Sequence, residues 1–221
     1  MKNVIFLLRM KVSKDTYKMA IIGQGGVGKT SIIDRIVKHR FIENTESTIG
    51  AAFSSIIYKD IKYQIWDTAG QERYKALIPM YLRHAKIVLI VYDVVDESSL
   101  EQVELHWIPF MKNNTENCHV ILIGNKCDIR FPEKEEIITK ANTISEKYSI
   151  PHLIVSAKMS TNIDSIFSTI DHLLHNNEKE LSDLSDLSDL SRKEEDNIQL
   201  DNTQTSNYLN GCYGAGSCNM F

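Results

Sequence analysis

The sequence has few cysteines and no excess of positive charge. Only 4 of its 221 residues are cysteine, which is too few and too scattered for a disulfide framework. Cys118 and Cys127 flank an apolar run and are predicted to be small core residues. The formal net charge is -4, whereas proteins that bind nucleic acids usually carry a basic patch or stripe. A nucleic acid is therefore not expected as a partner.

Long hydrophobic runs are also missing. No stretch has the length and apolarity of a membrane-spanning helix. The apolar run Val4–Leu8 is shorter than that of a signal peptide, and no small-residue cleavage site follows it. Position 2 is lysine, which excludes an N-myristoylation signal. We therefore expect the protein to be made and kept in the cytosol.

Composition divides the chain into three regions. Residues 1–16 form an N-terminal extension, and residues 17–176 alternate apolar runs with amphipathic segments, as a folded domain does. In residues 177–221 polar and charged residues dominate. The triplet Ser-Asp-Leu repeats there with a period of three residues, between Leu181 and Ser191. A period of three matches the burial pattern of neither helix nor strand, so this hypervariable tail is predicted to be disordered.

Strands and helices alternate within the predicted domain. Short runs rich in isoleucine and valine predict four buried strands: Met19–Ile22, Ile87–Tyr92, Val120–Ile123 and His152–Val155. The segment Ala52–Trp66 predicts a hairpin, with two strands on either side of Lys59 and Asp60. The pattern indicates an α/β fold: a six-stranded, mostly parallel sheet with one antiparallel edge strand and helices on both faces.

Some helix boundaries have local signals. Ser98 and Glu101 have the spacing of a capping box, and Pro132 suits the first turn of a later helix. Pro109 is expected to kink or end the helix that contains it. The last predicted helix has apolar residues at helical spacing: Ile163, Ile166, Phe167, Ile170, Leu173 and Leu174.

A glycine-rich segment, Gly23–Thr30, fits the phosphate-binding loop pattern GxxxxGK[ST], with a predicted strand before it and a predicted helix after it. Backbone N–H groups of such a loop face the phosphates, and the helix N-terminus adds its positive end. We expect Lys29 to reach the β- and γ-phosphates and the Thr30 hydroxyl to bind Mg²⁺. A glycine-rich turn that only caps a helix is the alternative. The predicted contacts are Gly23, Gly25, Gly26, Val27, Gly28, Lys29, Thr30 and Ser31.

A second motif, Asn-Lys-Cys-Asp, follows the predicted strand Val120–Ile123. It therefore lies at the carboxyl ends of the strands, where open α/β sheets bind ligands. The carboxylate of Asp128 can accept hydrogen bonds from the ring N–H and the exocyclic amine of guanine, a pair that adenine lacks. A surface turn is the alternative. The predicted base-side contacts are Asn125, Lys126, Asp128, Ser156, Ala157 and Lys158.

A third motif, Trp-Asp-Thr-Ala-Gly-Gln-Glu, occupies Trp66–Glu72. Asp67 ends a predicted strand, where its carboxylate can hold Mg²⁺ through water. The backbone N–H of Gly70 can reach the γ-phosphate, and Gln71 is placed to orient the attacking water, which makes it the candidate catalytic residue. A strand end followed by a plain turn is the alternative.

In their order and spacing, these elements resemble the Ras superfamily and its Rab branch over residues 17–176. Four further segments are similar to Rab proteins: Ile49–Phe53, Gln64–Gln71, Glu72–Tyr74 and Ile90–Asp93. The resemblance implies a P-loop G domain that binds GTP and GDP with Mg²⁺, hydrolyses GTP slowly, and has two loops that order with the γ-phosphate. It also implies that Thr48 is a second hydroxyl ligand of Mg²⁺ and that Phe41 stacks on the guanine.

The resemblance further implies an aromatic triad that effectors recognise. The predicted effector-facing residues are Ile49, Phe53, Trp66 and Tyr81. From the residues alone, these aromatics are more easily explained as core. The runs Ser47–Phe53 and Leu77–Tyr81 are similar to the early-endosomal Rabs in particular. The implied partners are an exchange factor, a GTPase-activating protein, a GDP-dissociation inhibitor, a prenyltransferase and vesicle-tethering effectors, acting on a monomer.

The sequence departs from the Rab pattern in the hairpin. Only twelve residues separate Phe53 from Trp66, fewer than in the usual Rab. An even deletion leaves each side chain on its own face of the sheet, so the hairpin is expected to be shorter but in register. The segment Tyr81–Ala85 also differs from the common Rab sequence. These departures bear on the choice of effector and not on GTP binding.

The chain ends Cys218-Asn-Met-Phe, a C-a-a-X pattern whose final phenylalanine favours a geranylgeranyl group. One prenyl chain usually needs a second signal for stable anchoring. The tail is acidic and not polybasic, so Cys212 is the candidate for a second lipid. We expect the protein in the cytosol and, through its lipid anchor, on the cytoplasmic face of intracellular membranes, endosomes in particular.

Two other classes of function are alternatives to a GTPase. A nucleotide-binding module without catalysis is opposed by the presence of Thr48, Asp67 and Gln71, and a P-loop ATPase or kinase by the Asn-Lys-Cys-Asp motif. No arginine lies between Phe41 and Gly50 to act as a built-in arginine finger. Intrinsic hydrolysis is therefore expected on the order of 10⁻⁴ to 10⁻³ per second, accelerated by an activating partner.

Overall fold

The computed structural model describes residues 15–175. The predicted N-terminal extension lies almost wholly outside the described residues, and the predicted tail, with Cys212, Cys218 and the Ser-Asp-Leu repeat, lies wholly outside them. The chain divides after residue 172 into two units. Of the second unit, the described residues 173–175 are helical.

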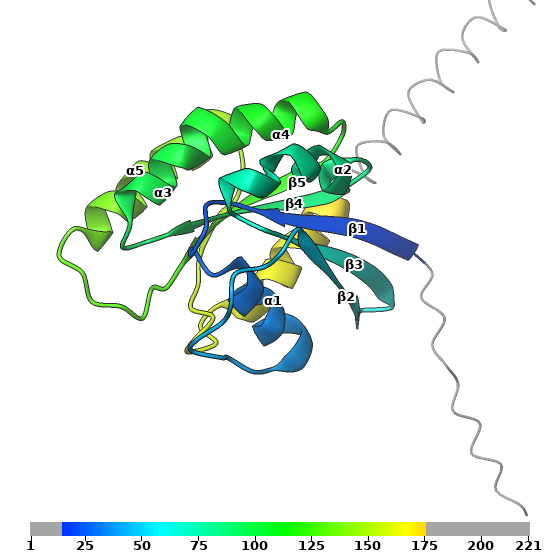
Figure 1. Cartoon of the computed structure of the whole chain (residues 1–221), viewed down its shortest axis with the longest axis horizontal. Helices are drawn as coiled ribbons and strands as arrows, with labels where there is room; N and C mark the ends of the chain where they lie inside the picture. Colours follow the sequence, from blue (N-terminus) through cyan, green and yellow to red (C-terminus); the bar gives the residue numbers. More distant parts are fainter. Residues whose placement is uncertain (1–14, 176–221) are drawn as a thin grey trace, which may run out of the picture. The chain divides into compact units, whose positions relative to one another are not determined.

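Six strands form one sheet, in the order β2-β3-β1-β4-β5-β6 (Figure 1). Neighbouring strands run parallel except for β2 and β3, and β2 lies at the edge. This confirms the predicted, mostly parallel sheet with one antiparallel edge strand. The strands are β1 (Asp15–Ile22), β2 (Ala51–Tyr58), β3 (Ile61–Thr68), β4 (Ile87–Asp93), β5 (His119–Asn125) and β6 (His152–Ile154).

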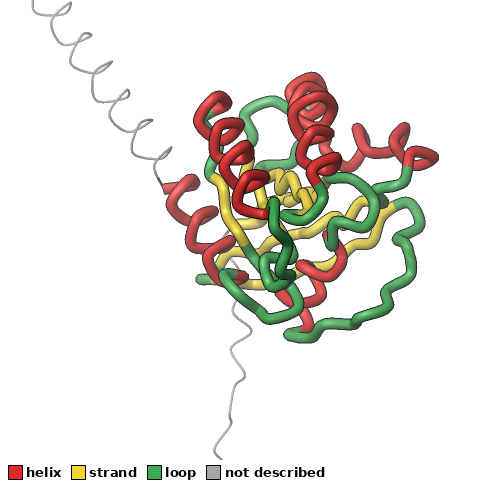
Figure 2. The backbone as a smooth tube through the Cα atoms, turned by 90° about the vertical axis from the view of Figure 1, so that its left-hand side faces the viewer, coloured by secondary structure: helices red, strands yellow, loops and turns green. Residues whose placement is uncertain are grey.

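Helices lie on both sides of the strands, as predicted (Figures 1 and 2). The helices are α1 (Lys29–Lys38), a 3₁₀ helix (Glu72–Leu77), α2 (Ile78–Leu82), α3 (Glu97–Gln102), a π-helical segment (Val103–Trp107), α4 (Ile108–Asn114), α5 (Lys134–Tyr148) and a last helix from residue 163 to 175. Within residues 15–175, none of these helices combines the length and apolarity needed to cross a membrane.

The centre of the sheet is apolar on both faces. All seven residues of β4 are buried, which is typical of a parallel strand covered by helices on both sides. On one face, side chains of β4 and β5 form a core cluster with residues of α3, the π-helical segment and α5. Cys118 and Cys127 are half-buried free thiols packed against this cluster, which confirms their prediction as core residues.

The β2–β3 hairpin is short and in register, as predicted. Phe53 pairs with Trp66, and Tyr58 pairs with Ile61. The two residues between the strands, Lys59 and Asp60, have φ values of 47° and 68°. Two successive left-handed residues are the backbone pattern of a type I′ turn, whose twist matches that of the strands it joins.

Local signals for helix ends are less reliable here. Asp96, and not Ser98, caps α3: its carboxylate accepts a hydrogen bond from the backbone N–H of Ser98 at 3.1 Å. Pro132 precedes α5 and does not lie in its first turn, because Glu133 is the N-cap. Pro109 does not end its helix either. The turn before it widens into the π-helical segment, and the helix continues to Asn114.

Candidate functional site

A cavity of about 350 Å³ lies at the carboxyl edge of the sheet. It brings together the glycine-rich loop after β1, the polar loop before β2, the end of β3, and the loops after β5 and β6. The predicted site residues that line the cavity are Gly25, Gly26, Gly28, Lys29, Thr30, Ser31, Phe41, Thr48, Gly70, Gln71, Asn125, Lys126, Asp128, Ala157 and Lys158. Four residues of the predicted nucleotide and Mg²⁺ sites, Gly23, Val27, Asp67 and Ser156, do not line the cavity.

The glycine-rich loop needs glycine where the chain comes close to other atoms. Gly28, the N-cap of α1, has a φ of 92°. A Cβ at Gly28 would collide with the side-chain amide of Asn125, and a Cβ at Gly23 would collide with the carbonyl oxygen of Val91. These contacts explain why Gly23, although outside the cavity, belongs to the motif. The loop leads directly into α1, whose free N–H groups favour an anion.

Lys29 is buried at the first position of α1. Its ammonium donates hydrogen bonds to the carbonyl oxygens of Gly23 and Gln24, both at 2.8 Å. Burial lowers the pKa of this ammonium to about 8, although the nearby carboxylate of Asp67 opposes the shift. The side chain is thus folded back across the loop and presents a partly desolvated positive charge to the cavity, as a phosphate site requires.

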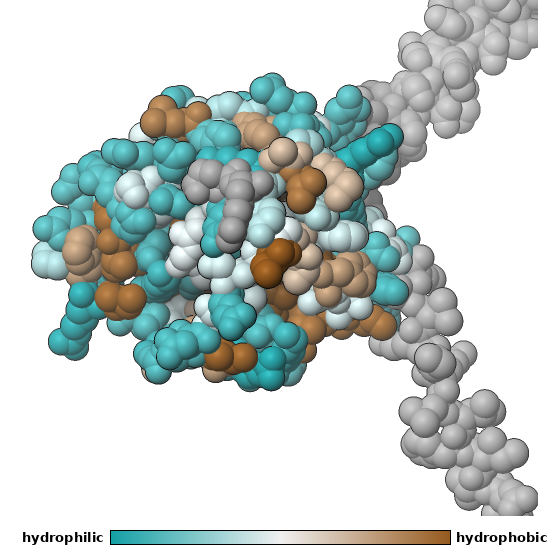
Figure 3. Space-filling model, in the orientation of Figure 1, coloured by the Kyte–Doolittle hydropathy of each residue, from teal (hydrophilic) through white to brown (hydrophobic). Residues whose placement is uncertain are grey.

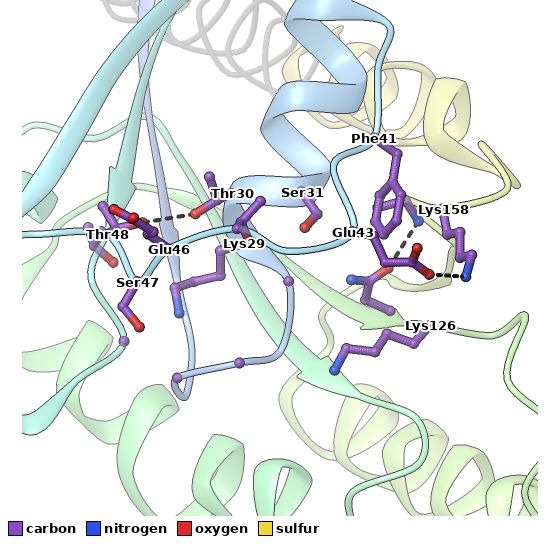
Figure 4. A pocket seen from close by; sticks show the side chains of 18 of the residues that line it. Lys29, Thr30, Ser31, Phe41, Glu43, Glu46, Ser47, Thr48, Lys126 and Lys158 are labelled. Atoms are coloured by element: carbon purple, nitrogen blue, oxygen red, sulfur yellow. Dashed lines mark hydrogen bonds and ion pairs between the residues drawn. The ribbon is translucent and has the colours of Figure 1, made fainter.

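Three oxygen-bearing side chains lie beside this lysine. The hydroxyls of Thr30 and Thr48 are 2.9 Å apart, although the residues belong to different segments (Figure 4). Burial raises the pKa of Asp67 above its usual value, and hydrogen bonds with Thr30 and Thr48 only partly oppose this rise. Among the described residues, Oδ1 of Asp67 has no hydrogen-bond partner. A buried carboxylate oxygen and two hydroxyls are the hard donors that Mg²⁺ prefers, so the residues present fit this ion.

Asn125 connects the two ends of the cavity. Its side-chain amide donates to the carbonyl oxygen of Val27 at 2.9 Å, and its Oδ1 accepts from the backbone N–H of Ala157 at 3.2 Å. Ser156 donates from its hydroxyl to Asp128 at 2.6 Å. Asn125 and Ser156 therefore hold the loops and the carboxylate that face the base. This explains why Ser156 belongs to the site without lining it.

Phe41, Lys126 and Lys158 lie at the base end of the cavity, opposite Thr30 and Thr48 (Figure 4). Lys126 has a φ of 68° and forms an ion pair with Asp93 at 2.6 Å. An aromatic ring, two lysine stems and the Asp128 carboxylate form a pocket for a flat, hydrogen-bonding ring. With the phosphate and Mg²⁺ end, the cavity fits a guanine nucleotide.

The predicted effector residues lie outside the cavity. The ring of Trp66 is 5.2 Å from that of Phe53 and 5.4 Å from that of Tyr81, so the three aromatics form one cluster. Phe53 is exposed, and Ile49 is exposed to 79%. Figure 3 shows apolar residues gathered over the region of β1–β3 and α2. The aromatic cluster is thus not simply part of the core. An exposed apolar surface of this kind is what a docking partner requires.

The structure adds residues that the sequence did not single out. Six more residues line the cavity: Glu43, Thr45, Glu46, Ser47, Thr68 and Ile129. Three of them belong to the polar loop around Thr48, and the polarity of that loop was the only available signal. No local pattern shows which of its side chains turn inward, because this depends on how the loop crosses the cavity.

Comparison with known proteins places the chain in a defined group. The model of the Ras family matches residues 18–176. The Ras-related protein Rab-11A of Dictyostelium discoideum is 38% identical over 159 residues, which cover 70% of this chain and 73% of the relative. The Ras-related protein Rab-5A of the same organism is 37% identical, with 70% and 78% covered. The Ras-related protein Rab-13 of Canis lupus familiaris is 38% identical, with 70% and 77% covered.

Proposed function

Since this chain belongs to the Ras family as a Rab small GTPase, we propose that it regulates vesicle traffic on membranes of the endocytic route. As a member of this family it binds GTP and GDP with Mg²⁺ and hydrolyses GTP. The observation that carries the proposal is the meeting of Lys29, Thr30, Thr48 and Asp128 in one cavity, with the carboxylate of Asp67 hydrogen-bonded to the two threonines.

We assign the phosphate end to Lys29 and the backbone of the glycine-rich loop. Mg²⁺, when bound, neutralises charge on the phosphates and positions them. Thr30, Thr48 and Asp67 would hold that ion, since the two hydroxyls lie 2.9 Å apart and both hydrogen-bond with the Asp67 carboxylate. Thr48 lies in the loop before β2, so its contact with Thr30 links the order of that loop to the phosphate end. This link supports a switch that the γ-phosphate orders.

Guanine selection is assigned to Asp128, with Asn125 and Ser156 as its supports. Ser156 already donates to one carboxylate oxygen of Asp128, which fixes the direction of this group. A fixed acceptor left unpaired by adenine can discriminate strongly between the bases. Gln71 lines the cavity beside Gly70 and is assigned to orient the attacking water.

The endocytic role is the finer part of the proposal. It is supported by the two runs that resemble early-endosomal Rabs, Ser47–Phe53 and Leu77–Tyr81. The similar proteins named Rab-11A, Rab-5A and Rab-13 do not single out this route. The family implies an exchange factor, a GTPase-activating protein, a GDP-dissociation inhibitor and effectors. Of these, tethering effectors would dock on the aromatic cluster of Phe53, Trp66 and Tyr81.

A nucleotide titration tests the core of the proposal. The full chain is stripped of nucleotide with a chelator and titrated with GDP, GTP and ATP in Mg²⁺. Tight binding of both guanine nucleotides is expected, with ATP about a thousandfold weaker or more. Comparable ATP affinity, or no binding at all, would mean that the loops around Asp128 do not select guanine.

Membrane attachment is tested in cells with the full chain. Cys218→Ser is expected to leave nucleotide binding intact and to move the protein to the soluble fraction, because the prenyl acceptor is lost. Cys212→Ser is expected to weaken attachment without abolishing it. Unchanged membrane association of Cys218→Ser would refute the anchor.

Localisation tests the endocytic role separately. The tagged full chain is expected to coincide with an internalised fluid-phase tracer at early times, while Cys218→Ser stays diffuse. A wild-type protein confined to late-loaded or secretory compartments would contradict the endocytic assignment and leave the GTPase assignment unaffected.

A further inference from the structure

Helix α1 carries an arginine that none of the roles above uses. Arg35 is half-buried, and its guanidinium donates to three backbone carbonyls. Nε donates to the carbonyl oxygen of Ala157 at 2.8 Å, and Nη2 donates to that of Lys158 at 2.9 Å. Nη1 donates to the carbonyl oxygen of His39 at 3.3 Å. One side chain therefore joins α1 to the loop after β6 and to the segment that leads to Phe41.

Both of these segments form the base end of the cavity. Ala157, Lys158 and Phe41 line it, whereas Arg35 does not. Ser156, directly before Ala157, holds the carboxylate of Asp128. Arg35 thus acts on the base through the backbone of the loop and not by touching the nucleotide.

A second connection joins the same two segments. Lys158 and Glu43 form an ion pair at 2.9 Å across the mouth of the cavity (Figure 4). Their side chains are 51% and 75% exposed, and exposed ion pairs of this kind are screened and weak. The three bonds of Arg35 are charge-assisted and come from one planar group whose donors are already oriented, and the bond to Ala157 is partly buried. The geometry therefore indicates that Arg35 contributes more than the Lys158–Glu43 ion pair to holding these segments together.

We propose that Arg35 is a positioning residue that closes the base end of the cavity around the guanine and so sets the rate of nucleotide release. The proposal rests on the GTPase function above. Removal of the guanidinium frees the loop of Ala157 and Lys158 from α1 and loosens Asp128 through Ser156. Differences in affinity between variants of one site appear mainly in the dissociation rate.

The test compares wild type, Arg35→Ala, Arg35→Lys and, as a control, Lys38→Ala in the full chain. Each is loaded with fluorescent GDP in Mg²⁺, and release is followed after addition of excess GDP. We expect release from Arg35→Ala to be about 10- to 100-fold faster, as for the loss of charge-assisted hydrogen bonds. Arg35→Lys should fall between, because one ammonium cannot span the three carbonyls. Lys38, exposed on the same helix and paired only with Asp34 in its own helix, should behave as wild type.

Two further readouts separate positioning from general destabilisation. The preference for GDP over IDP, which lacks the exocyclic amine, should fall in Arg35→Ala because Asp128 is less well held. Single-turnover hydrolysis of bound GTP should stay unchanged, because Arg35 is bonded to the base-side loops and not to the phosphate end.

Unchanged release from Arg35→Ala, or an equal loss of GDP and IDP affinity, overturns the inference. If Arg35→Ala loses its folded circular dichroism spectrum, Arg35→Lys carries the same test with the same outcomes. A wild-type protein that fails to bind guanine nucleotides contradicts the proposed function itself. Wild-type binding with unaltered release from the variants contradicts only the role of Arg35.

Discussion

At the scale of single residues, the site depends on glycines that leave no space for a side chain. Gly70 lies just after β3, in the loop that we propose to face the γ-phosphate. A Cβ there would meet the ammonium of Lys29 and would come within 2.6 Å of the backbone nitrogen of Gly25 and 2.7 Å of the carbonyl carbon of Gln24. The sequence motif indicated that this residue approaches the phosphate. Only the structure shows that the backbone of Gln24 and Gly25 and a buried lysine converge on it.

Gly70→Ala should therefore weaken GTP binding, because backbone atoms cannot move aside as a flexible side chain can. A cost of about 1 to 3 kcal/mol is expected, as for overpacking of a buried site. Affinities for GTP and GDP are measured by titration. The matched variant is Gly26→Ala, where nothing lies within 4 Å of the added carbon and only the φ of 81° is unfavourable. Equal effects of the two substitutions would contradict the role of close contact.

The lowered pKa of Lys29 predicts a pH dependence of nucleotide binding. Burial lowers this pKa from 10.5 to about 8 in the chain alone, and a bound phosphate favours the charged ammonium. Between the pKa of Lys29 in the free protein and its higher pKa in the complex, binding takes up a proton. The affinity for GDP therefore falls as the pH rises above 8. The loss should reach up to about tenfold per pH unit above pH 8. Titrations of GDP from pH 7 to 9.5 check this, and a constant affinity over that range would refute it.

At the scale of elements, the shortened hairpin is fixed to the last helix. The ring of Tyr58, at the tip of β2, stacks on Phe167 at 4.8 Å, and Tyr63 of β3 contacts the same ring edge-on at 5.2 Å. Lys59 adds an ion pair with Asp171 at 2.7 Å. These contacts hold the far end of the hairpin in place, and the hairpin joins the two loops that we propose to face the γ-phosphate.

Phe167→Ala should destabilise the domain by about 3 to 5 kcal/mol, because a buried ring that contacts two others is lost. Urea unfolding in saturating GDP measures this. GDP affinity of the folded variant should change little, since Phe167 does not line the cavity. Met159→Ala, at a side chain exposed to 65%, is the control and should stay within about 0.5 kcal/mol of wild type.

The helix around Pro109 shows why element boundaries are hard to predict. Proline cannot donate to the carbonyl four residues before it, so a kink or an end of the helix is expected at Pro109. Instead, the backbone N–H of Ile108 donates to the carbonyl of Val103 in a widened π-helical turn. Val103 and Trp107 in that turn are buried in the core. Tertiary packing of this face keeps the helix continuous where local propensity alone favours an end.

At the scale of the whole molecule, nucleotide binding and folding are coupled. The cavity is built from five segments that the rest of the fold must bring together, so only the folded protein can bind the nucleotide. GDP at a hundred times its dissociation constant should stabilise the protein by about 2.7 kcal/mol. A thermal scan should show an increase of several degrees with GDP and none with ATP. Equal increases with both nucleotides would contradict selection of guanine.

The amino-acid pattern alone predicts the order of strands and helices along the chain, the antiparallel edge hairpin, the phosphate loop and the base-reading motif. These features are local: burial periodicity reports strands and helices, and a phosphate loop needs contiguous backbone N–H groups that only a short run of glycines permits. Asp67 and Gly70 could be placed at the end of a strand for the same reason.

Contacts between distant parts of the chain hold these motifs in place, and they depend on tertiary packing. Asn125 bonds to Val27, 98 positions away, and Arg35 bonds to Ala157, 122 positions away. Neither residue shows these contacts in its local pattern, because they depend on how α1 packs beside the loops after β5 and β6. A half-buried arginine on a helix has the same sequence signal as an exposed one. Packing alone gives it carbonyl oxygens to bind.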